Sequence, residues 1–398
     1  MKPKLRFPGY EEEWEEKKLG DIAQKFTGGG TPSTKEKTYW INGDIPWIQS
    51  SDLLKESITI PTISKKITIT ALERSSAKKI MANSIAIVTR VGVGKVAYIH
   101  HSYATSQDFL SLSGINGDPL FWTYRIKKLM EKQSFYLQGT SIKGITKDEV
   151  LKIKVYAPFI HEQKKIGEFF SLLDQRIEKQ EEKIELMKER KKGWMQKVFH
   201  QEIRFKDENG NDYPDWEEKK LGEVADIKGG YAFKSQEFSY EGVPVITISN
   251  INKFIYDNQS FNHSVLSNNQ ILKGKSGDIL VALSGATTGK SGQIKEGNYY
   301  INQRIARIRH HHNLNSYLFN WINSNDFNKQ LNKLLVAGAQ PNLSIIDLKQ
   351  LLIPLPSIPE QEKIANFLSA QDKLIEKEEE KLNLLKEQKK GLLQQMFV

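Results

Sequence analysis

Five short stretches carry residue types that could perform chemistry, and the most suggestive of them runs from Ser284 to Ser291. It approaches the phosphate-binding loop G-x-x-x-x-G-K-[ST], in which backbone amides and Lys290 would hold a nucleotide. The first position is Ser rather than Gly, and residues 292–297 lack the pattern of the helix whose amino terminus binds the phosphates. We predict that this stretch binds no nucleotide.

The other four stretches are also incomplete. Gly92–Ala97 resembles a dinucleotide fingerprint without a helix behind it. Asp44–Trp47 departs from the Asp-Pro-Pro-Trp of amino-methyltransferases, because Ile45 replaces the first proline. Asp215 lies only two residues from its potential metal-binding partner, and His310–His312 has no metal-ligand spacing, which favours a solvated loop. We predict no catalytic residue and no metal site in this chain.

Composition narrows the class of protein. The chain has 398 residues, 38% hydrophobic and 27% charged, with no cysteine and a formal net charge of +10. The lack of cysteine excludes disulfides and thiolate metal sites. No apolar run approaches the roughly 18 residues that a membrane span needs. We expect a cytoplasmic protein without a membrane partner, and the mild basic excess favours a polyanionic one.

The sequence contains a long internal repeat. Trp14–Gly20 returns unchanged as Trp216–Gly222, and Glu162–Ile166 resembles Glu360–Ile364. The residues between these flanking motifs agree only at a few strand and turn positions. We interpret this pattern as two similar mounts that carry two different domains, which we call the first reader (1–157) and the second reader (201–356).

Each reader is followed by a long amphipathic helix, predicted over 158–200 and 357–398. Apolar residues alternate at spacings of four and three, which is typical of a coiled-coil seam. Gln180, Lys191 and Lys389 are among the polar residues that interrupt it. We expect the two helices to pair antiparallel through the following seam: Ile166, Phe170, Leu173, Ile177, Ile184, Met187 and Trp194 in the first, and Ile364, Leu368, Ile375, Leu382, Leu385 and Leu392 in the second.

The readers themselves are predicted to be mixed α/β domains. Short runs rich in Ile, Val and Thr, such as 85–88, 245–248 and 279–283, predict strands. Helical patterns accompany them around 120–133 and 317–335. The predicted fold class is therefore α/β, with two mixed α/β domains separated by a pair of long antiparallel coiled-coil helices and related by a pseudo-twofold repeat.

This combination resembles the DNA-specificity subunit of type I restriction–modification enzymes. The resemblance lies in the repeated Trp-Glu-Glu-Lys-Lys-Leu-Gly motif, in Gly29–Ser33, in Gly43–Ile48 with Ser51–Leu53, and in Pro359–Ile364 at the start of the second helix. The second reader departs from it, because Gly229–Phe233 replaces the Thr-Pro-Ser turn. The resemblance covers essentially the whole chain.

The resemblance implies a non-catalytic subunit whose readers are target-recognition domains. Each reader would contact one half of a bipartite asymmetric sequence in double-stranded DNA. The helices would separate the readers and bind two methyltransferase subunits, and two motor-nuclease restriction subunits would join for cleavage. S-adenosylmethionine, ATP and Mg would belong to those partner subunits, so this chain would hold no cofactor.

The length of the helix is compatible with a spacing role. From Ile166 to Val198 it would be roughly 50 Å long, which equals about 14 base pairs of duplex. Polar residues in loops after strands are the candidates for DNA contact. They are Ser50, Ser51, Thr89, Arg90, Lys95, Gln107 and Lys143 in the first reader, and Ser249, Asn250, Thr287, Thr288, Lys290, Gln303, Arg304, Gln340 and Asn342 in the second.

Two alternatives stay open from the sequence alone. One is a self-sufficient ATPase or nuclease built around Lys290 or Asp215, and the other is a coiled-coil scaffold without a DNA role. The repeat makes one further geometric prediction. Leu5 and Phe7 should pack near Met396 and Phe397, because the equivalent residues 199–216 join the first helix to the second reader.

Overall fold

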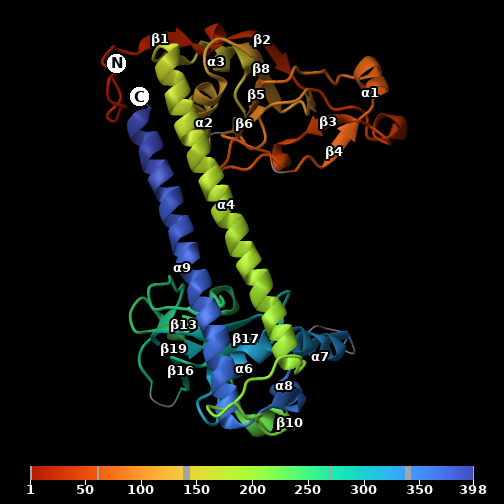
Figure 1. Cartoon of the computed structure of the whole chain (residues 1–398), viewed down its shortest axis with the longest axis vertical. Helices are drawn as coiled ribbons and strands as arrows, with labels where there is room; N and C mark the ends of the chain where they lie inside the picture. The colour runs from red at the N-terminus through yellow and green to blue at the C-terminus, as the bar shows by residue number, and fades with distance from the viewer. Residues whose placement is uncertain (1, 61, 138–143, 269–270, 337–341, 398) are drawn as a thin grey trace. The chain divides into compact units, whose positions relative to one another are not determined.

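The computed structural model describes residues 2–60, 62–137, 144–268, 271–336 and 342–397 (Figure 1). It divides into two compact units, one comprising residues 1–182 with 380–398 and the other residues 183–379. The four predicted segments, two readers and two long helices, were divided by their position along the chain. The two units are divided by which residues pack together, so each long helix belongs partly to each unit. Each unit therefore contains one reader and the parts of both long helices that pack on it.

The first unit is built on an antiparallel sheet with the strand order β2-β8-β5-β6. Its strands are β2 (Ala23–Gly28), β5 (Ser84–Val88), β6 (Val96–Ile99) and β8 (Phe109–Ile115). The smaller sheets are β4-β3-β7, made of β3 (Ile45–Ile48), β4 (Lys65–Ile67) and β7 (Ala104–Thr105), and β1 (Glu15–Lys18) with β9 (Lys154–Ala157). The helices are α1 (Ile69–Arg74), α2 (Pro119–Leu137) and α3 (Lys147–Lys152), with 3-10 turns η1 (Leu19–Asp21), η2 (Lys37–Tyr39) and η3 (Ser50–Asp52).

The second unit repeats this plan with the order β11-β20-β17-β18-β14. These strands are β11 (Ala225–Gly229), β14 (Phe254–Ile255), β17 (Ile279–Ala282), β18 (Ser291–Ile294) and β20 (Ile305–His310). A second sheet, β12-β15-β13-β19-β16, has β12 (Phe238–Ser239), β13 (Val243–Ile246), β15 (Ser264–Val265), β16 (Lys273–Lys275) and β19 (Asn298–Ile301), and β10 (Glu217–Lys220) pairs with β21 (Leu352–Leu355). The helices are α5 (Leu221–Val224), α6 (Asn315–Ile322), α7 (Asn325–Val336) and α8 (Ile345–Gln350), with turns η4 (Ser235–Glu237) and η5 (Ile248–Asn250).

The two readers therefore share one topology, which confirms the predicted duplication of a mixed α/β domain. The order β2-β8-β5-β6 corresponds to β11-β20-β17-β18. The repeated entry motif forms β1 and β10, which pair antiparallel with β9 and β21 at the foot of each reader. The helical pattern predicted around 317–335 is confirmed, and it comprises two helices, α6 and α7. Asn323 caps the end of α6, and the Ser324 hydroxyl accepts from the amide of Phe327 at the start of α7.

The two long helices, α4 (Ile160–Phe199) and α9 (Ile358–Met396), pack against each other antiparallel. In the first unit the rings of Phe170 and Phe397 stack with centroids 5.7 Å apart. In the second unit Trp194 meets Phe367 edge-on at 5.8 Å. Because the partner's number falls as the number along α4 rises, the helices run in opposite directions. The predicted antiparallel pair is confirmed.

The core of the first unit joins the sheet, α2 and both long helices. Trp14, Phe121, Phe170 and Phe397 are all buried in it. A Cβ at Gly167 would lie 2.3 Å from the Asp118 carboxylate and 2.9 Å from the Phe121 amide, so only glycine lets the start of α2 approach α4 this closely.

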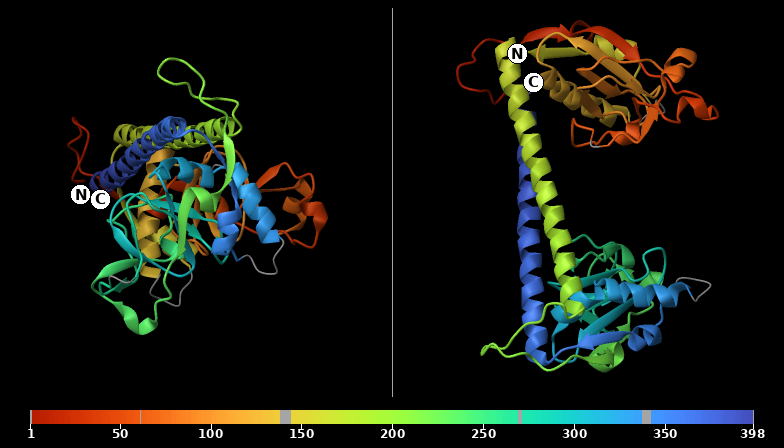
Figure 2. Two further views of the ribbon diagram at one scale, coloured as in Figure 1. Left: turned by 90° about the horizontal axis from the view of Figure 1, so that it is seen from below. Right: turned by 45° about the vertical axis from the view of Figure 1, so that its right-hand side comes forward.

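The two ends of the described chain meet in this unit. The amide of Leu5 donates to the carbonyl of Gln395 at 3.0 Å, and Phe7 packs on the core that contains Met396 and Phe397. Figure 2 shows the red amino-terminal and blue carboxyl-terminal segments side by side. The predicted packing is confirmed for Phe7, whereas Leu5 lies beside the last helical turn through its backbone and its side chain is exposed. No helix within the described ranges combines the length and apolar character needed to cross a membrane.

Candidate nucleic-acid interface

Four segments of the first reader meet at one end of its main sheet, where β5 ends and β6 and β8 begin. The Lys95 ammonium donates to the carbonyl of Ser50 at 2.8 Å, and the Thr89 hydroxyl donates to the carbonyl of Asp108 at 3.0 Å. The amide of Ile145 donates to the carbonyl of Thr89 at 2.8 Å. The antiparallel order of β6, β5 and β8 forces these loops together, although they are far apart in sequence.

The predicted DNA-contact residues of the first reader divide by exposure. Ser51, Arg90 and Gln107 are exposed at this end of the sheet, whereas Thr89 is buried. Ser50 and Lys95 are half-buried and hold two loops together through the bond between them. Arg90, Ser51 and Gln107 therefore present side chains to an approaching ligand, while Thr89 and Lys95 shape the surface. Lys143 lies outside the described residues.

In the second reader, Gln303, Arg304 and Asn342 line one open hollow of about 490 Å³. Backbone bonds build it: the amide of Leu283 donates to the carbonyl of Arg304, and the amide of Leu343 to the carbonyl of Leu283, each at 2.8 Å. The hollow lies at the end of β17 that corresponds to the loop cluster of the first reader. Gln340 lies outside the described residues.

The remaining predicted residues of the second reader lie in two turns. The Asn250 side chain accepts from the amide and hydroxyl of Thr247, at 3.0 and 2.7 Å, so it closes its own turn, and Ser249 is exposed beside it. The hydroxyl of Thr288 donates to the carbonyl of Gly285 at 2.7 Å. Thr287 and Lys290 are exposed in that second turn.

Three of the incomplete chemical motifs have structural roles. Residues 283–290 form the turn of a hairpin that leads into β18, and residues 92–95 lead into β6, so neither stretch precedes a helix that could hold phosphates. Trp47 is buried and donates to the carbonyl of Gly30 at 3.1 Å. Among the described residues no group of His, Asp and Glu side chains is arranged to hold a metal ion.

One prediction about these motifs was wrong. His310 is not part of a solvated loop but is 2% exposed at the end of β20. Burial, together with the neighbouring His312 and His311, lowers the pKa of His310 to about 4. It is therefore a neutral core residue at physiological pH.

The predicted seam residues lie on α4 and α9, and two of them, Phe170 and Trp194, contact Phe397, directly after α9, and Phe367 of α9. Every one of Ile166, Phe170, Leu173, Ile177, Ile184, Met187 and Trp194, and of Ile364, Leu368, Ile375, Leu382, Leu385 and Leu392, is buried or half-buried. The polar residues Gln180, Lys191 and Lys389 that interrupt the seam are buried as well. Buried charges need partners, and the structure supplies them from outside the predicted set.

Two equivalent ion pairs attach the entry segments to the helices. Arg6 binds both carboxylate oxygens of Glu162 at 2.7 Å, and Arg204 binds Glu360 at 3.2 and 2.9 Å. Both glutamates are buried. The hydrogen bond and the negative charge of Glu162 raise the pKa of Arg6. These pairs hold two similar triplets, Leu5-Arg6-Phe7 and Ile203-Arg204-Phe205, in place.

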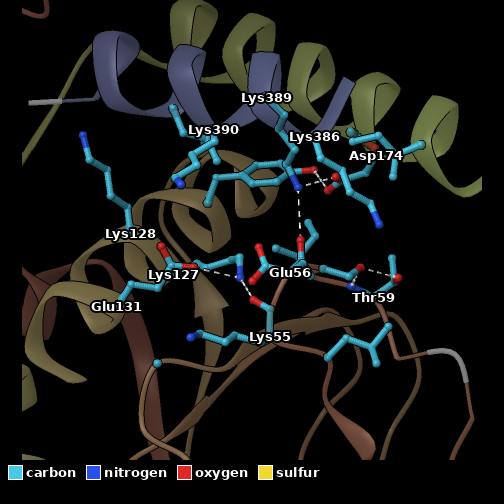
Figure 3. Close-up of a pocket in the computed structure, with 18 of the residues that line it drawn as sticks. Lys55, Glu56, Thr59, Lys127, Lys128, Glu131, Asp174, Lys386, Lys389 and Lys390 are labelled. Carbon is cyan, nitrogen blue, oxygen red and sulfur yellow. Dashed lines mark hydrogen bonds and ion pairs between the residues drawn. The ribbon is translucent and has the colours of Figure 1, made fainter. Parts of the chain in front are cut away.

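In the first unit, a polar junction joins both long helices to the reader. Lys389 of α9 forms an ion pair with Asp174 of α4, and the Tyr124 hydroxyl of α2 donates to the same carboxylate at 2.6 Å. Lys389 also reaches the carbonyl of Glu56 at 3.4 Å (Figure 3). The junction borders a cleft of about 990 Å³ between residues 54–59, α2 and the helix pair.

The cleft is lined by charges of both signs. Lys127, Lys128, Lys386 and Lys390 project from α2 and α9 around it, and Lys127 pairs with Glu131 at 3.0 Å (Figure 3). Burial and two neighbouring cations lower the pKa of Lys128 to about 8. Its ammonium donates to the carbonyl of Phe397 at 2.7 Å.

The second unit contains the equivalent junction. Lys191 of α4 binds both carboxylate oxygens of Asp372 of α9 at 2.8 and 2.7 Å, and also the side-chain oxygen of Asn320 in α6 at 2.9 Å. Lys253 adds a further contact to Asp372 at 2.6 Å. Lys191 and Lys389 were visible in the sequence as polar seam positions. Their partners Asp174, Asp372, Tyr124 and Asn320 gave no local signal, because only folding brings them to the seam.

Comparison with known proteins identifies this architecture. The family described as "Type I restriction modification DNA specificity domain" matches residues 11–188 and 213–387, one match for each repeat. The chain belongs to this family. A Methanocaldococcus jannaschii relative, the type I restriction enzyme MjaVIII specificity subunit, is 31% identical over 410 aligned positions, covering 97% of this chain and 92% of the relative.

Two further comparisons agree with this membership. The Escherichia coli EcoR124I/EcoR124II specificity subunit is 34% identical over 179 residues, which is 43% of each chain. The crystal structure of the type I restriction–modification S subunit of M. genitalium superposes with a TM-score of 0.60 at 16% identity, covering 100% of this chain and 99% of the other. At that identity the superposition supports the fold of this specificity subunit.

Proposed function

We propose that the two readers contact the two halves of a bipartite asymmetric sequence in double-stranded DNA. The observation that carries this proposal is the duplication itself. The readers share one strand order and one set of mounting contacts, whereas the loops at the equivalent sheet ends carry different side chains. Two different half-sites require readers that attach to the helices in the same way and carry different side chains in their loops.

The exposed side chains of those loops suit base recognition. Arg90 and Gln107 in the first reader, and Gln303, Arg304 and Asn342 in the second, can bind base edges in the major groove. Arginine pairs well with guanine, and Asn or Gln with adenine. The neighbouring serine and threonine hydroxyls suit phosphate contacts, which position the duplex.

The long helices have two roles in this proposal. They set the spacer between the half-sites, and they bind two methyltransferase subunits, which two motor-nuclease subunits join for cleavage. Large apolar side chains on α4 and α9 support a docking role: Leu172, Leu186, Leu374 and Leu384 are 64%, 66%, 47% and 59% exposed. S-adenosylmethionine, ATP and Mg would be bound by the partner subunits in the cytoplasm, and this chain would act without a cofactor.

Sequencing of methylated adenines tests the proposal. The chain is expressed with the methyltransferase subunit of its own system, as wild type and as Arg304→Ala, with Lys329→Ala, an exposed residue of α7, as the control. We expect Arg304→Ala to relax or weaken one base of one half-site by about 1–3 kcal/mol and to leave the other half unchanged. Equal loss at both half-sites would contradict separate readers, and no change at either would contradict base contact by Arg304.

A further inference from the structure

The two buried polar junctions form a pair under the internal repeat. Lys389 with Asp174 in the first unit, and Lys191 with Asp372 in the second, place the same two residue types at equivalent positions of the two helices. In each junction one of the two charged groups also binds a side chain of a reader helix. In the first unit this is Tyr124, and in the second it is Asn320.

Such junctions are a costly way to stabilise a seam. Burial of an ion pair often contributes less than well-packed apolar residues of the same volume would. Polar residues within an apolar seam instead specify register and orientation, because an alternative alignment leaves a buried charge without a partner. Here each junction also has a third arm, the hydrogen bond to Tyr124 in the first unit and to Asn320 in the second. This bond extends the geometric constraint from the helix pair to the reader.

We propose that Tyr124 and Asn320 are positioning residues that fix the angle of each reader on the helix pair and so select the length of the DNA spacer. The inference rests on the proposed reading of two half-sites. A hydrogen bond to a charged group is directional, whereas the apolar contacts around it tolerate sliding and rotation. Each reader is therefore held at one angle, and half-sites displaced by one base pair do not meet both readers.

The first reader depends more strongly on its junction than the second. In the second unit Lys253 also binds Asp372, the Tyr256 hydroxyl donates to Glu376 at 2.8 Å, and the space beside the junction is only about 160 Å³. In the first unit the corresponding space is the cleft of about 990 Å³. The cleft leaves the first junction open on one side, where the bond from Lys128 of α2 to the carbonyl of Phe397 also joins α2 to the end of α9.

Tyr124→Phe isolates this third arm. The ring, which packs on Phe170 at 5.3 Å, stays in place, and the ion pair between Lys389 and Asp174 is retained. Tyr156→Phe is a matched control. Its hydroxyl donates to Glu16 at the same 2.6 Å, but that bond joins β9 to β1 and does not reach a long helix.

The full chain is expressed with the methyltransferase subunit of its own system, and methylated adenines are mapped by sequencing. Wild type should methylate one bipartite sequence with one spacer. With Tyr124→Phe we expect methylation at spacers one base pair shorter or longer, with the preference for the original spacer reduced about tenfold, equal to about 1.4 kcal/mol. Tyr156→Phe should keep the single spacer, and Asn320→Ala should broaden it less than Tyr124→Phe.

The outcomes distinguish failure of the positioning role from failure of the proposed function. Unchanged spacer selectivity in Tyr124→Phe, with a cooperative unfolding transition, overturns the positioning role. Equal broadening in Tyr124→Phe and Tyr156→Phe also overturns it, because the effect would then be general loosening of the reader. A wild type that methylates no bipartite sequence refutes the proposed function instead.

Discussion

Lengthening both long helices together should lengthen the DNA spacer. The perturbation inserts four helix-forming residues after Glu182 in α4 and four after Glu379 in α9, where the two compact units divide. Coiled coils accommodate a four-residue insertion by a local change of winding. Because both helices are extended, the Asp174–Lys389 and Lys191–Asp372 junctions keep their partners.

The size of the expected change follows from helix geometry. Four residues add about 6 Å and rotate the distal part of the helix by about 40°. One base pair adds about 3.4 Å along the duplex, so the added length corresponds to nearly two base pairs. One base pair also turns the duplex by about 34°, so the rotation corresponds to one. We therefore expect a spacer longer by one or two base pairs, with both half-sites unchanged.

The control extends α4 alone. Asp174 pairs with Lys389, and Lys191 pairs with Asp372. Four extra residues between Asp174 and Lys191 therefore displace one of these pairs by about one helical turn relative to α9. Breaking a buried ion pair by displacing one partner costs about 3–5 kcal/mol. We expect this variant to unfold at a clearly lower denaturant concentration than wild type and the doubly extended chain.

The assay is sequencing of methylated adenines, with urea unfolding as the test of folding. A doubly extended chain that folds normally and methylates the original spacer would refute the role of the helices as spacers. Loss of base identity at either half-site would refute the separation between helices and readers.

Three further predictions test other features. Arg6→Leu should lower the free energy of unfolding by about 3–5 kcal/mol, because it leaves the buried Glu162 carboxylate without its bidentate partner; urea titration against Arg176→Leu, on the exposed face of α4, checks this. The pKa of His310 falls from 6.5 to about 4 on folding, so the unfolded chain binds that proton more readily and stability should fall between pH 6.5 and pH 4, by at most about 3 kcal/mol. That pH dependence should shrink in His310→Asn, and an unchanged slope would show that another group is responsible. Replacing residues 21–155 with the equivalent part of a relative should change one half-site only, and mapping of methylated adenines would expose any change in the other.

Part of this fold is determined by local sequence patterns. The heptad spacing predicts α4 and α9, and the repeated motifs at Trp14 and Trp216 predict the duplicated mounts, because both depend on residues close together in the chain. The helical pattern around 317–335 is divided into α6 and α7 at Asn323 and Ser324, whose capping bonds compete with helix continuation. Residues that can cap a helix are visible in the sequence. Whether the helix ends at them depends on whether the chain must change direction there to bury its apolar residues in the core.

The sequence by itself determined the repeat, the two long helices, the mixed α/β character of the readers and the family resemblance, since periodicity and matched motifs survive without knowledge of distant contacts. Only the tertiary structure decided which residues act together. It placed His310 in the core, brought Arg304 and Asn342 to one hollow, and joined Tyr124 to Asp174. The physical reason is that burial and hydrogen bonding depend on neighbours in space, and here those neighbours are separated in the chain by an entire strand, helix or reader.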